Sequence, residues 1–344
     1  MKYTIGAQQR ELFWDVAKAL AIFCVIWGHT VCNLSMELNG WLTDPVNSVI
    51  IHFHMPLFMF ISGYFAFSSL SRDPWITFRN KARQLLLPSL TWFIVLSMLA
   101  IAFHRNLSSD RIKDILTTLP VSYWFLKALF LCYVITIIGA VIYHWHKWGL
   151  LLYILLIGCF AEQLNYVSTI SMLPFFLLGL ACNKYRDRVF DKSIWLFSGC
   201  SLIFISIICL YHTNNYNIYY FPFKFDLGGV RTLILRIIVG FCGSLAILIF
   251  LKWLVERCAS STIIRLIGKV GTLTLGIYCI QAFFAEGLFK SFAGLTKGMA
   301  PSIYFYVLTP LASLGVVLIS VVIIKYIKKS RWLNFLLLGE KLKQ

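Results

Sequence analysis

The chain has 344 residues, of which 59% are apolar and only 13% charged, and its mean hydropathy is +0.79. This composition excludes a soluble domain, since such domains carry about 25% charged residues. It predicts an all-α, polytopic integral membrane protein. The net charge of +17 is expected of a membrane protein anchored at the inner leaflet and does not imply nucleic-acid binding.

Ten apolar segments follow one another along the chain and are predicted to be transmembrane helices, both termini lying on the same side. The fifth is the shortest: its run from Gly149 to Ala161 falls short of the ~20 residues of a straight span, so we expect a tilted, longer or re-entrant helix. We predict a single integral-membrane domain over residues 1–344. The expected spans are residues 12–32, 48–69, 84–104, 122–143, 148–161, 168–184, 193–211, 231–254, 268–289 and 302–327.

The basic residues predict the orientation of these helices. With the N-terminus in the cytoplasm, 21 of the 31 Lys and Arg residues fall in cytoplasmic segments, seven in outer segments and three within spans. This excess is the positive-inside pattern, and it places both termini in the cytoplasm. The first segment has no small-residue cleavage site behind it, so we expect a retained helix and not a signal peptide.

The first segment carries ionisable residues that hydrocarbon disfavours. Asp15, Lys18 and His29 lie within it, and charged groups inside a span are costly and therefore point to function. At ~100° per residue, eleven steps return to within roughly 20° of the starting direction, so Lys18 and His29 share a helix face about 16 Å apart. Asp15 lies near the same stripe, where it either joins the site or simply neutralises Lys18. This helix suits an enzyme whose two substrates arrive from opposite sides of a membrane.

Five motifs, in order along the chain, carry a resemblance to a known family. They are Asp15-x2-Lys18-x10-His29, the run FHMPLFMFISGY at residues 53–64, Arg79-Asn-Lys-Ala-Arg83 leading to Pro88, Trp124-Phe125-Leu126, and Gly271-Thr-Leu-Thr-Leu-Gly-Ile-Tyr278. From about residue 10 to 330 the chain resembles the membrane-bound acyltransferase-3 family, the bacterial surface-polysaccharide O-acyltransferases. One position departs from the pattern, because Gln281 stands where relatives often have histidine, which weakens the expectation of a catalytic role for that helix.

The resemblance implies an enzyme of the bacterial cytoplasmic (inner) membrane that takes an acyl group from cytoplasmic acyl-CoA, usually acetyl from acetyl-CoA. The acyl group is delivered to a hydroxyl of an extracytoplasmic sugar in a surface polysaccharide or glycolipid precursor. The expected partners are acyl-CoA as co-substrate, a carbohydrate acceptor and membrane lipids, without nucleic acid. No metal is expected, and the ten cysteines, which lack CxxC or paired spacing, are predicted to be packing residues.

The implied reaction needs a group that activates the acceptor, because a sugar hydroxyl is a poor nucleophile near neutral pH. His29 is the candidate general base, and a positioned base accelerates such a reaction by ~10²–10⁴-fold. The alternative is nucleophilic, with a transient acyl-imidazole carrying the acyl group between two substrates that never meet. Asp15 is grouped with His29 as a candidate catalytic residue. The plain alternative is a buried histidine hydrogen-bonded to a neighbouring helix.

CoA carries a pyrophosphate and a 3′-phosphate, which need cations at the cytoplasmic face. Arg79 and Arg83 are candidates, because residues four apart share a helix face and guanidinium groups bind phosphate bidentately. Lys18, a turn or two inside the membrane, is a candidate for a phosphate or the thioester region. The positive-inside rule explains a basic loop without any ligand, and that alternative stays open.

Three further residues are candidate contacts for the acceptor. His54 carries the family match in the second segment. Ser62 can offer a hydroxyl to the site, although small residues are also ordinary packing devices in membrane helices. Trp124 can stack on a sugar ring, although an aromatic residue is expected at the membrane interface in any case.

Two other classes of protein share this polytopic, basic-inside character. An exporter or flippase of a lipid-linked saccharide or polysaccharide needs a sugar path but no CoA site, so acyl-CoA binding or thiol release separates it from a transferase. A structural partner of a synthase complex would not explain why Lys18 and His29 share a buried stripe.

Overall fold

The structure is a computed structural model that describes residues 7–34, 44–104, 117–119, 122–164, 168–184, 193–213 and 226–342. Within these ranges every regular element is a helix, which confirms the predicted all-α class. In chain order the elements are α1 (Ala7–Asn33), α3 (Pro45–Leu70), α4 (Pro74–Lys81), η1 (Ala82–Leu86), α5 (Leu87–His104), α7 (Trp124–Trp145), α8 (Lys147–Cys159), α9 (Ala161–Leu164), α10 (Thr169–Lys184), α12 (Ser193–Thr213), α13 (Leu227–Cys258), α14 (Thr262–Gly271), α15 (Thr274–Gln281), η3 (Ala282–Leu288), α16 (Phe289–Phe292), η4 (Ala293–Thr296), α17 (Pro301–Ile303), η5 (Tyr304–Leu308), α18 (Thr309–Ile327) and α19 (Arg331–Leu338).

Helix length and apolarity indicate a multi-pass membrane protein, but the predicted count of ten crossings is not confirmed. In the described part of the chain, six helical runs are long and apolar enough to cross a membrane: Leu12–Asn33, Pro45–Leu70, Pro74–Ala102, Trp124–Trp145, Leu227–Cys258 and Pro301–Ile327. A seventh crossing results if Thr262–Gly271 and Thr274–Thr296, bent by 67°, form one span. Two other predicted segments are helices shorter than the ~20 residues that a straight span needs, at Lys147–Cys159 and Thr169–Lys184; in the third, α12, the apolar run Ile194–Leu210 is likewise shorter than a straight span.

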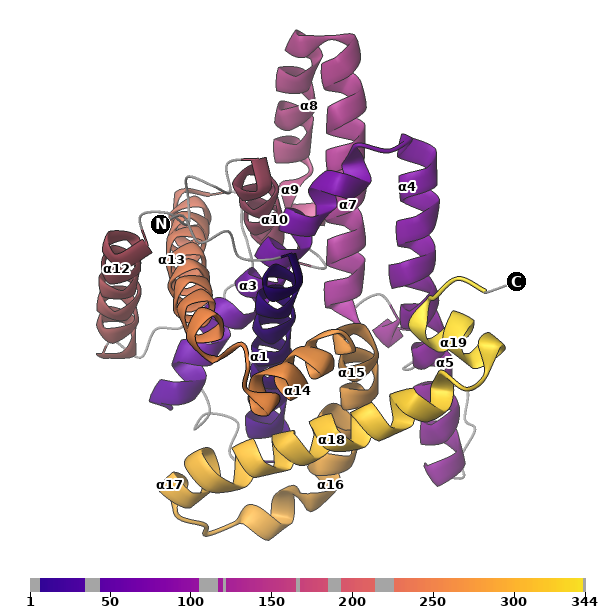
Figure 1. Cartoon of the computed structure of the whole chain (residues 1–344), viewed down its shortest axis with the longest axis vertical. Coiled ribbons are helices and arrows are strands. Elements are labelled where there is room, and N and C mark those ends of the chain that lie inside the picture. Colours follow the sequence, from indigo (N-terminus) through magenta and orange to yellow (C-terminus); the bar gives the residue numbers. More distant parts are fainter. Residues whose placement is uncertain are drawn as a thin grey trace.

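The fifth predicted segment is as short as the sequence indicates. α8 has 13 residues, and none of its side chains is buried. It packs against α7, and the hydroxyl of Tyr153 donates a hydrogen bond to the carbonyl oxygen of Ile135 at 3.1 Å. Figure 1 shows α7 and α8 as a hairpin that extends beyond the other helices. α8 lies apart from the residues discussed below, whereas the N-terminal part of α7 lines the cavity described there.

α1 is the central helix of the fold. It contacts α3, α13, α14, α15, η3 and α18, and in Figure 1 it lies between α13 and α7. Ala17, Ala21, Ile22 and Ile26 on this helix are fully buried. In a membrane, such contacts are stabilised by close van der Waals packing between helices rather than by exclusion of water. The helix that carries Lys18 and His29 is therefore held from several sides.

Two motif glycines allow the closest helix contacts. A Cβ at Gly63 of α3 would lie 1.9 Å from the carbonyl oxygen of Phe176 in α10, and one at Gly271 of α14 would lie 1.8 Å from the carbonyl oxygen of Asp15 in α1. Only glycine tolerates backbones this close. Gly63 therefore lets α3 pack closely against α10. Gly271 in turn brings the bend between α14 and α15 directly against α1.

The orientation with both termini in the cytoplasm stays a prediction. Part of the charge pattern behind it falls on residues outside the described ranges, among them Lys2, Arg105, Arg111, Lys113, Arg186, Arg188, Lys192 and Lys224.

Candidate active site

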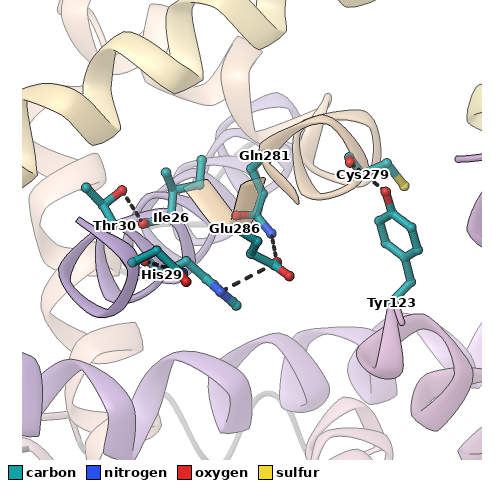
Figure 2. Close-up of polar contacts among 8 residues, drawn as sticks. Ile26, His29, Thr30, Tyr123, Cys279, Gln281 and Glu286 are labelled. Carbon is teal, nitrogen blue, oxygen red and sulfur yellow. Dashed lines mark hydrogen bonds and ion pairs between the residues drawn. The ribbon is translucent and has the colours of Figure 1, made fainter. Parts of the chain in front are cut away.

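α1 and η3 bring a histidine and a carboxylate together. Nδ1 of His29, near the end of α1, lies 3.5 Å from Oε1 of Glu286 in η3 (Figure 2). The two side chains are 33% and 44% exposed, so a polar substrate can reach them. A carboxylate beside Nδ1 favours the tautomer that carries its proton there, which leaves Nε2 as a proton acceptor. His29 thus has the arrangement of a general base oriented by a carboxylate.

Gln281 contacts the same carboxylate oxygen as His29. Its Nε2 donates a hydrogen bond to Oε1 of Glu286 at 2.8 Å, as Figure 2 shows, and the residue is only 1% exposed. The Oε1 atom of Gln281 has no hydrogen-bond partner among the described residues. A buried polar atom without a partner is unfavourable and asks for an explanation. Here it provides a hydrogen-bond acceptor next to the histidine and carboxylate.

The π-helical geometry of η3 makes this contact. On an α-helix, residues five apart point ~140° away from each other at ~100° per residue, so Gln281 and Glu286 would not meet. η3 begins directly after Gln281 and contains Glu286. In a π-helix, residue i+5 lies back over residue i, so Glu286 lies near Gln281. Such segments are frequent at functional sites.

Hydrogen bonds to α18 fix the rotation of α1 at this end. Nε1 of Trp27 donates to Oγ1 of Thr309 at 2.9 Å, and Oγ of Ser313 donates to Oγ1 of Thr30 at 3.0 Å. Trp27 and Thr30 flank His29 in the sequence, so these bonds keep α1 from turning about its axis. The direction of the imidazole is therefore set by two of the elements that contact α1, namely α18 and η3.

Nearer its middle, α1 borders a cavity. Nζ of Lys18 lies 2.6 Å from Oδ1 of Asp15, so Asp15 neutralises Lys18, which was one of its two expected roles. Asp15 lies ~21 Å along the helix axis from His29. Lys18 lines a cavity of about 360 Å³, at the lower end of the range for ligand pockets. The polar or charged side chains of its wall include Lys18, Ser62, Gln84, Lys328 and Glu340.

Aromatic side chains extend from the cavity wall toward the surroundings of Glu286. Phe125 and Tyr278 line the cavity, with ring centroids 5.8 Å apart in an edge-on arrangement. Tyr123 packs edge-on against Tyr278 at 6.2 Å and donates its hydroxyl to the carbonyl oxygen of Cys279 at 3.1 Å (Figure 2). Both tyrosines lie within electrostatic range of Glu286. Tyr278 thus belongs to the cavity wall and to the surroundings of the Glu286 carboxylate at once.

The three residues predicted to contact the sugar acceptor lie in different parts of the structure. Nδ1 of His54 hydrogen-bonds the carbonyl oxygen of Ile50 at 2.6 Å, and the ring lies within electrostatic range of His29. Ser62 lines the Lys18 cavity. Trp124 is the first residue of α7 and packs edge-on against Phe125, with centroids 6.0 Å apart. Their contacts with a sugar stay predictions.

The two predicted phosphate-binding arginines differ in their surroundings. Arg79 is exposed on α4, whereas Arg83 is half-buried in the π-helical η1 and its Nε donates to the carbonyl oxygen of Gly339 at 3.3 Å. Because the chain becomes π-helical at Ala82, their spacing of four no longer follows the α-helical repeat. Arg83 still borders the cavity through Gly339, which belongs to its wall.

Glu286 is not among the site residues predicted from the sequence, and Gln281 was predicted only as a departure from the family pattern. A signal for Glu286 was present, because a carboxylate inside the expected span 268–289 is itself a mark of function. Gln281 was expected to weaken the role of its helix. In the structure η3 supplies Glu286, which contacts His29, and the helix before it supplies Gln281, which bonds Glu286.

These features define a class of protein: a multi-pass helical membrane protein whose central helix carries a histidine–carboxylate pair near its C-terminal end and, eleven residues earlier, a lysine that lines a cavity. Within the described ranges, no group of three or more His, Cys, Asp or Glu side chains is placed to hold a metal ion.

Comparison with known proteins narrows this class. A family model described as an acyltransferase domain matches residues 11–327, and the chain therefore belongs to the acyltransferase-3 family. Among curated proteins, Nodulation protein NolL of Sinorhizobium fredii is 33% identical over 180 residues, which cover 51% of this chain and 49% of the relative. Nodulation protein NolL of Mesorhizobium japonicum is 34% identical over 135 residues, covering 38% and 36%. These alignments span about half or less of the relatives' lengths. No solved structure matches significantly.

Proposed function

We propose that the chain moves an acyl group, in the first place acetyl, from cytoplasmic acyl-CoA to a hydroxyl of an extracytoplasmic sugar in a surface polysaccharide or glycolipid precursor. The observation that carries the proposal is the unbroken helix α1, which presents Lys18 to a cavity and, eleven residues further on, His29 to Glu286. The family supports acyl transfer, and the separation of Lys18 from His29, ~16 Å along the axis, supports substrates that arrive from opposite sides.

At the His29 end, the proposed chemistry is general-base catalysis. Nε2 takes the proton of the sugar hydroxyl while the hydroxyl oxygen attacks the carbonyl carbon of the thioester. The new C–O bond forms, the C–S bond breaks, and the leaving sulfur takes the proton from the imidazolium to give CoA-SH. Glu286 stabilises the imidazolium, and Gln281 orients Glu286.

At the Lys18 end, the cavity suits the acylated arm of the donor. Phe58 and Phe125 give it an apolar wall, and Lys18 and Lys328 give it cations. A volume of about 360 Å³ favours occupation by the arm, with the nucleotide and its phosphates at the surface near Arg83. From this cavity the thioester reaches His29 by passing Tyr278.

A two-step route uses the same residues. Nε2 of His29 attacks the thioester carbonyl carbon, the C–S bond breaks, and the leaving sulfur takes the proton that Nδ1 gives up, which yields CoA-SH and an acyl-imidazole. The sugar hydroxyl then attacks the acyl carbon, the N–C bond breaks, and the hydroxyl proton returns to the imidazole. The two routes differ when the acceptor is left out. The two-step route releases one CoA-SH per protein from acetyl-CoA alone, whereas the general-base route releases none until a hydroxyl is supplied.

The proposal is tested with the purified protein in lipid vesicles. Acetyl-CoA is supplied together with lipid-linked glycans from the native membrane, thiol release is followed, and the glycans are examined by mass spectrometry. The expected result is CoA-SH formation matched by O-acetylation of the glycan. Glycan movement across the vesicle membrane without thiol release would contradict the proposal and support the exporter alternative.

A further inference from the structure

α19 (Arg331–Leu338) and the turn after it have a defined place beside the donor cavity. They follow residue 327, where the family match ends. Nε1 of Trp92 in α5 donates to the carbonyl oxygen of Leu337 at 2.9 Å. The helix ends at Gly339 with φ of 65°, the left-handed conformation that favours glycine. Figure 1 shows α19 next to α5.

This segment contributes a carboxylate to the wall of the cavity. Leu338, Gly339 and Glu340 all line the cavity that contains Lys18. Oε1 of Glu340 lies 2.9 Å from Nζ of Lys328, and its Oε2 accepts a hydrogen bond from Nδ2 of Asn334 at 2.8 Å. Both oxygens of Glu340 are therefore bound, one by a cation and one by an amide, as the oxygens of a bound anion would be.

The two lysines of the cavity differ in how firmly they are paired. Lys18 and Asp15 are one helical turn apart, with side chains 26% and 23% exposed and 2.6 Å between the charged atoms. Lys328 and Glu340 lie on different elements, are 41% and 45% exposed and are 2.9 Å apart. An exposed pair of this kind contributes little to stability. A phosphate carries more charge than a carboxylate and forms stronger charge-assisted hydrogen bonds, so it can displace Glu340 from Lys328.

We propose that Lys328 binds a phosphate of the acyl-CoA donor and that Glu340 occupies this lysine until the donor displaces it. This inference rests on the proposed function, because it takes acyl-CoA as the donor. α19 and its following turn then cover the donor cavity when it is empty, and the Lys328–Glu340 pair is the contact that donor binding breaks. The cover would favour donors with a phosphate over short thioesters that lack one.

The test measures CoA binding by the full chain in detergent micelles. Lys328→Gln removes the cation and should weaken CoA binding ~10-fold or more, the scale of one lost charge-assisted contact. Glu340→Gln removes the competing carboxylate and should tighten CoA binding ~3–10-fold. Lys329→Gln is the matched control: Lys329 is exposed, its Nζ lies 4.5 Å from the ring centroid of Tyr326, and it does not line the cavity.

A second measurement follows the cover itself. CoA should raise hydrogen exchange at residues 331–340 in the wild-type chain, and Glu340→Gln should show raised exchange there without CoA. CoA binding by Lys328→Gln that equals binding by Lys329→Gln would overturn the inference. Unchanged or weaker binding by Glu340→Gln would overturn it as well. If either binding result occurs while the wild type binds CoA and acetylates glycan, the proposed role of Lys328 and Glu340 fails and the proposed function stands. A wild type that binds no CoA would instead refute the assignment of acyl-CoA as the donor.

Discussion

The exchange of Glu286 for glutamine tests whether the carboxylate assists His29. The substitution keeps the size and shape of the side chain but removes its charge, 3.5 Å from Nδ1. At that distance a unit charge stabilises an imidazolium by about 1 kcal/mol in bulk water and by about 5 kcal/mol at an effective dielectric constant of about 20. Because the two side chains are 33% and 44% exposed, the contribution lies toward the lower value.

We therefore expect Glu286→Gln to raise the activation barrier by ~1.5–3 kcal/mol, which lowers kcat ~10–100-fold. The KM for acetyl-CoA should change little, because the proposed donor cavity lies at the Lys18 end of α1. The assay is thiol release in vesicles at saturating acetyl-CoA with native lipid-linked glycan.

The matched control is Glu256→Gln, since Glu256 is a similarly exposed carboxylate, 3.8 Å from Lys252 and away from the site. A Glu286→Gln protein with the kcat of the control would refute the assigned role of the carboxylate. A loss confined to acetyl-CoA binding would instead move Glu286 to the donor site.

Three further changes follow from the same structure. Gly271→Ala puts a Cβ 1.8 Å from a backbone carbonyl oxygen of α1 and should lower the free energy of unfolding by ~1–3 kcal/mol, measured by thermal unfolding. Gly315→Ala is the control and should leave the unfolding temperature unchanged, because open space surrounds Gly315. Arg83→Ala should weaken CoA binding by ~1.5–3 kcal/mol, measured by calorimetry, with a smaller loss for dephospho-CoA if the lost contact is to the 3′-phosphate; unchanged affinity would leave this arginine a product of the positive-inside rule. Cysteine labelling of sealed cells from outside should reach a probe at Asn39 and miss one at Asp187, both outside the described residues, and reaction at Asp187 would reverse the orientation.

The helical repeat within one unbroken element was enough to predict part of the site. α1 keeps the α-helical repeat from Ala7 to Asn33, so the direction and spacing of Lys18 and His29 follow from counting residues. The ion pair between Asp15 and Lys18 follows in the same way, because residues three apart meet on a helix surface. The apolar segments likewise marked where helices occur.

The partners of His29 could not be predicted in this way. The contact with Glu286 joins residues more than 250 positions apart, and no periodicity reports such a distance. The contact between Gln281 and Glu286 depends on a π-helical segment, and an α-helical count would have turned the two side chains apart.

The predicted number of crossings is not confirmed, for a different physical reason. Hydropathy does not separate a helix that faces lipid from one that packs inside the protein. α10 illustrates this, because it is short but buries Phe175 and Phe176 completely. Apolar residues that pack against other helices therefore count toward a predicted span as much as those that face lipid.

The most direct test of the central claim is acyl transfer by His29→Ala, measured as acetylated glycan in vesicles together with CoA binding. His146→Ala, an exposed histidine at the start of α8, is the matched control. We expect His29→Ala to bind CoA with near-normal affinity and to lose transfer, with residual activity if His29 is a general base and essentially none if it carries the acyl group. Near-normal acetylation of the glycan by folded His29→Ala protein would show that His29 does not take part in the transfer.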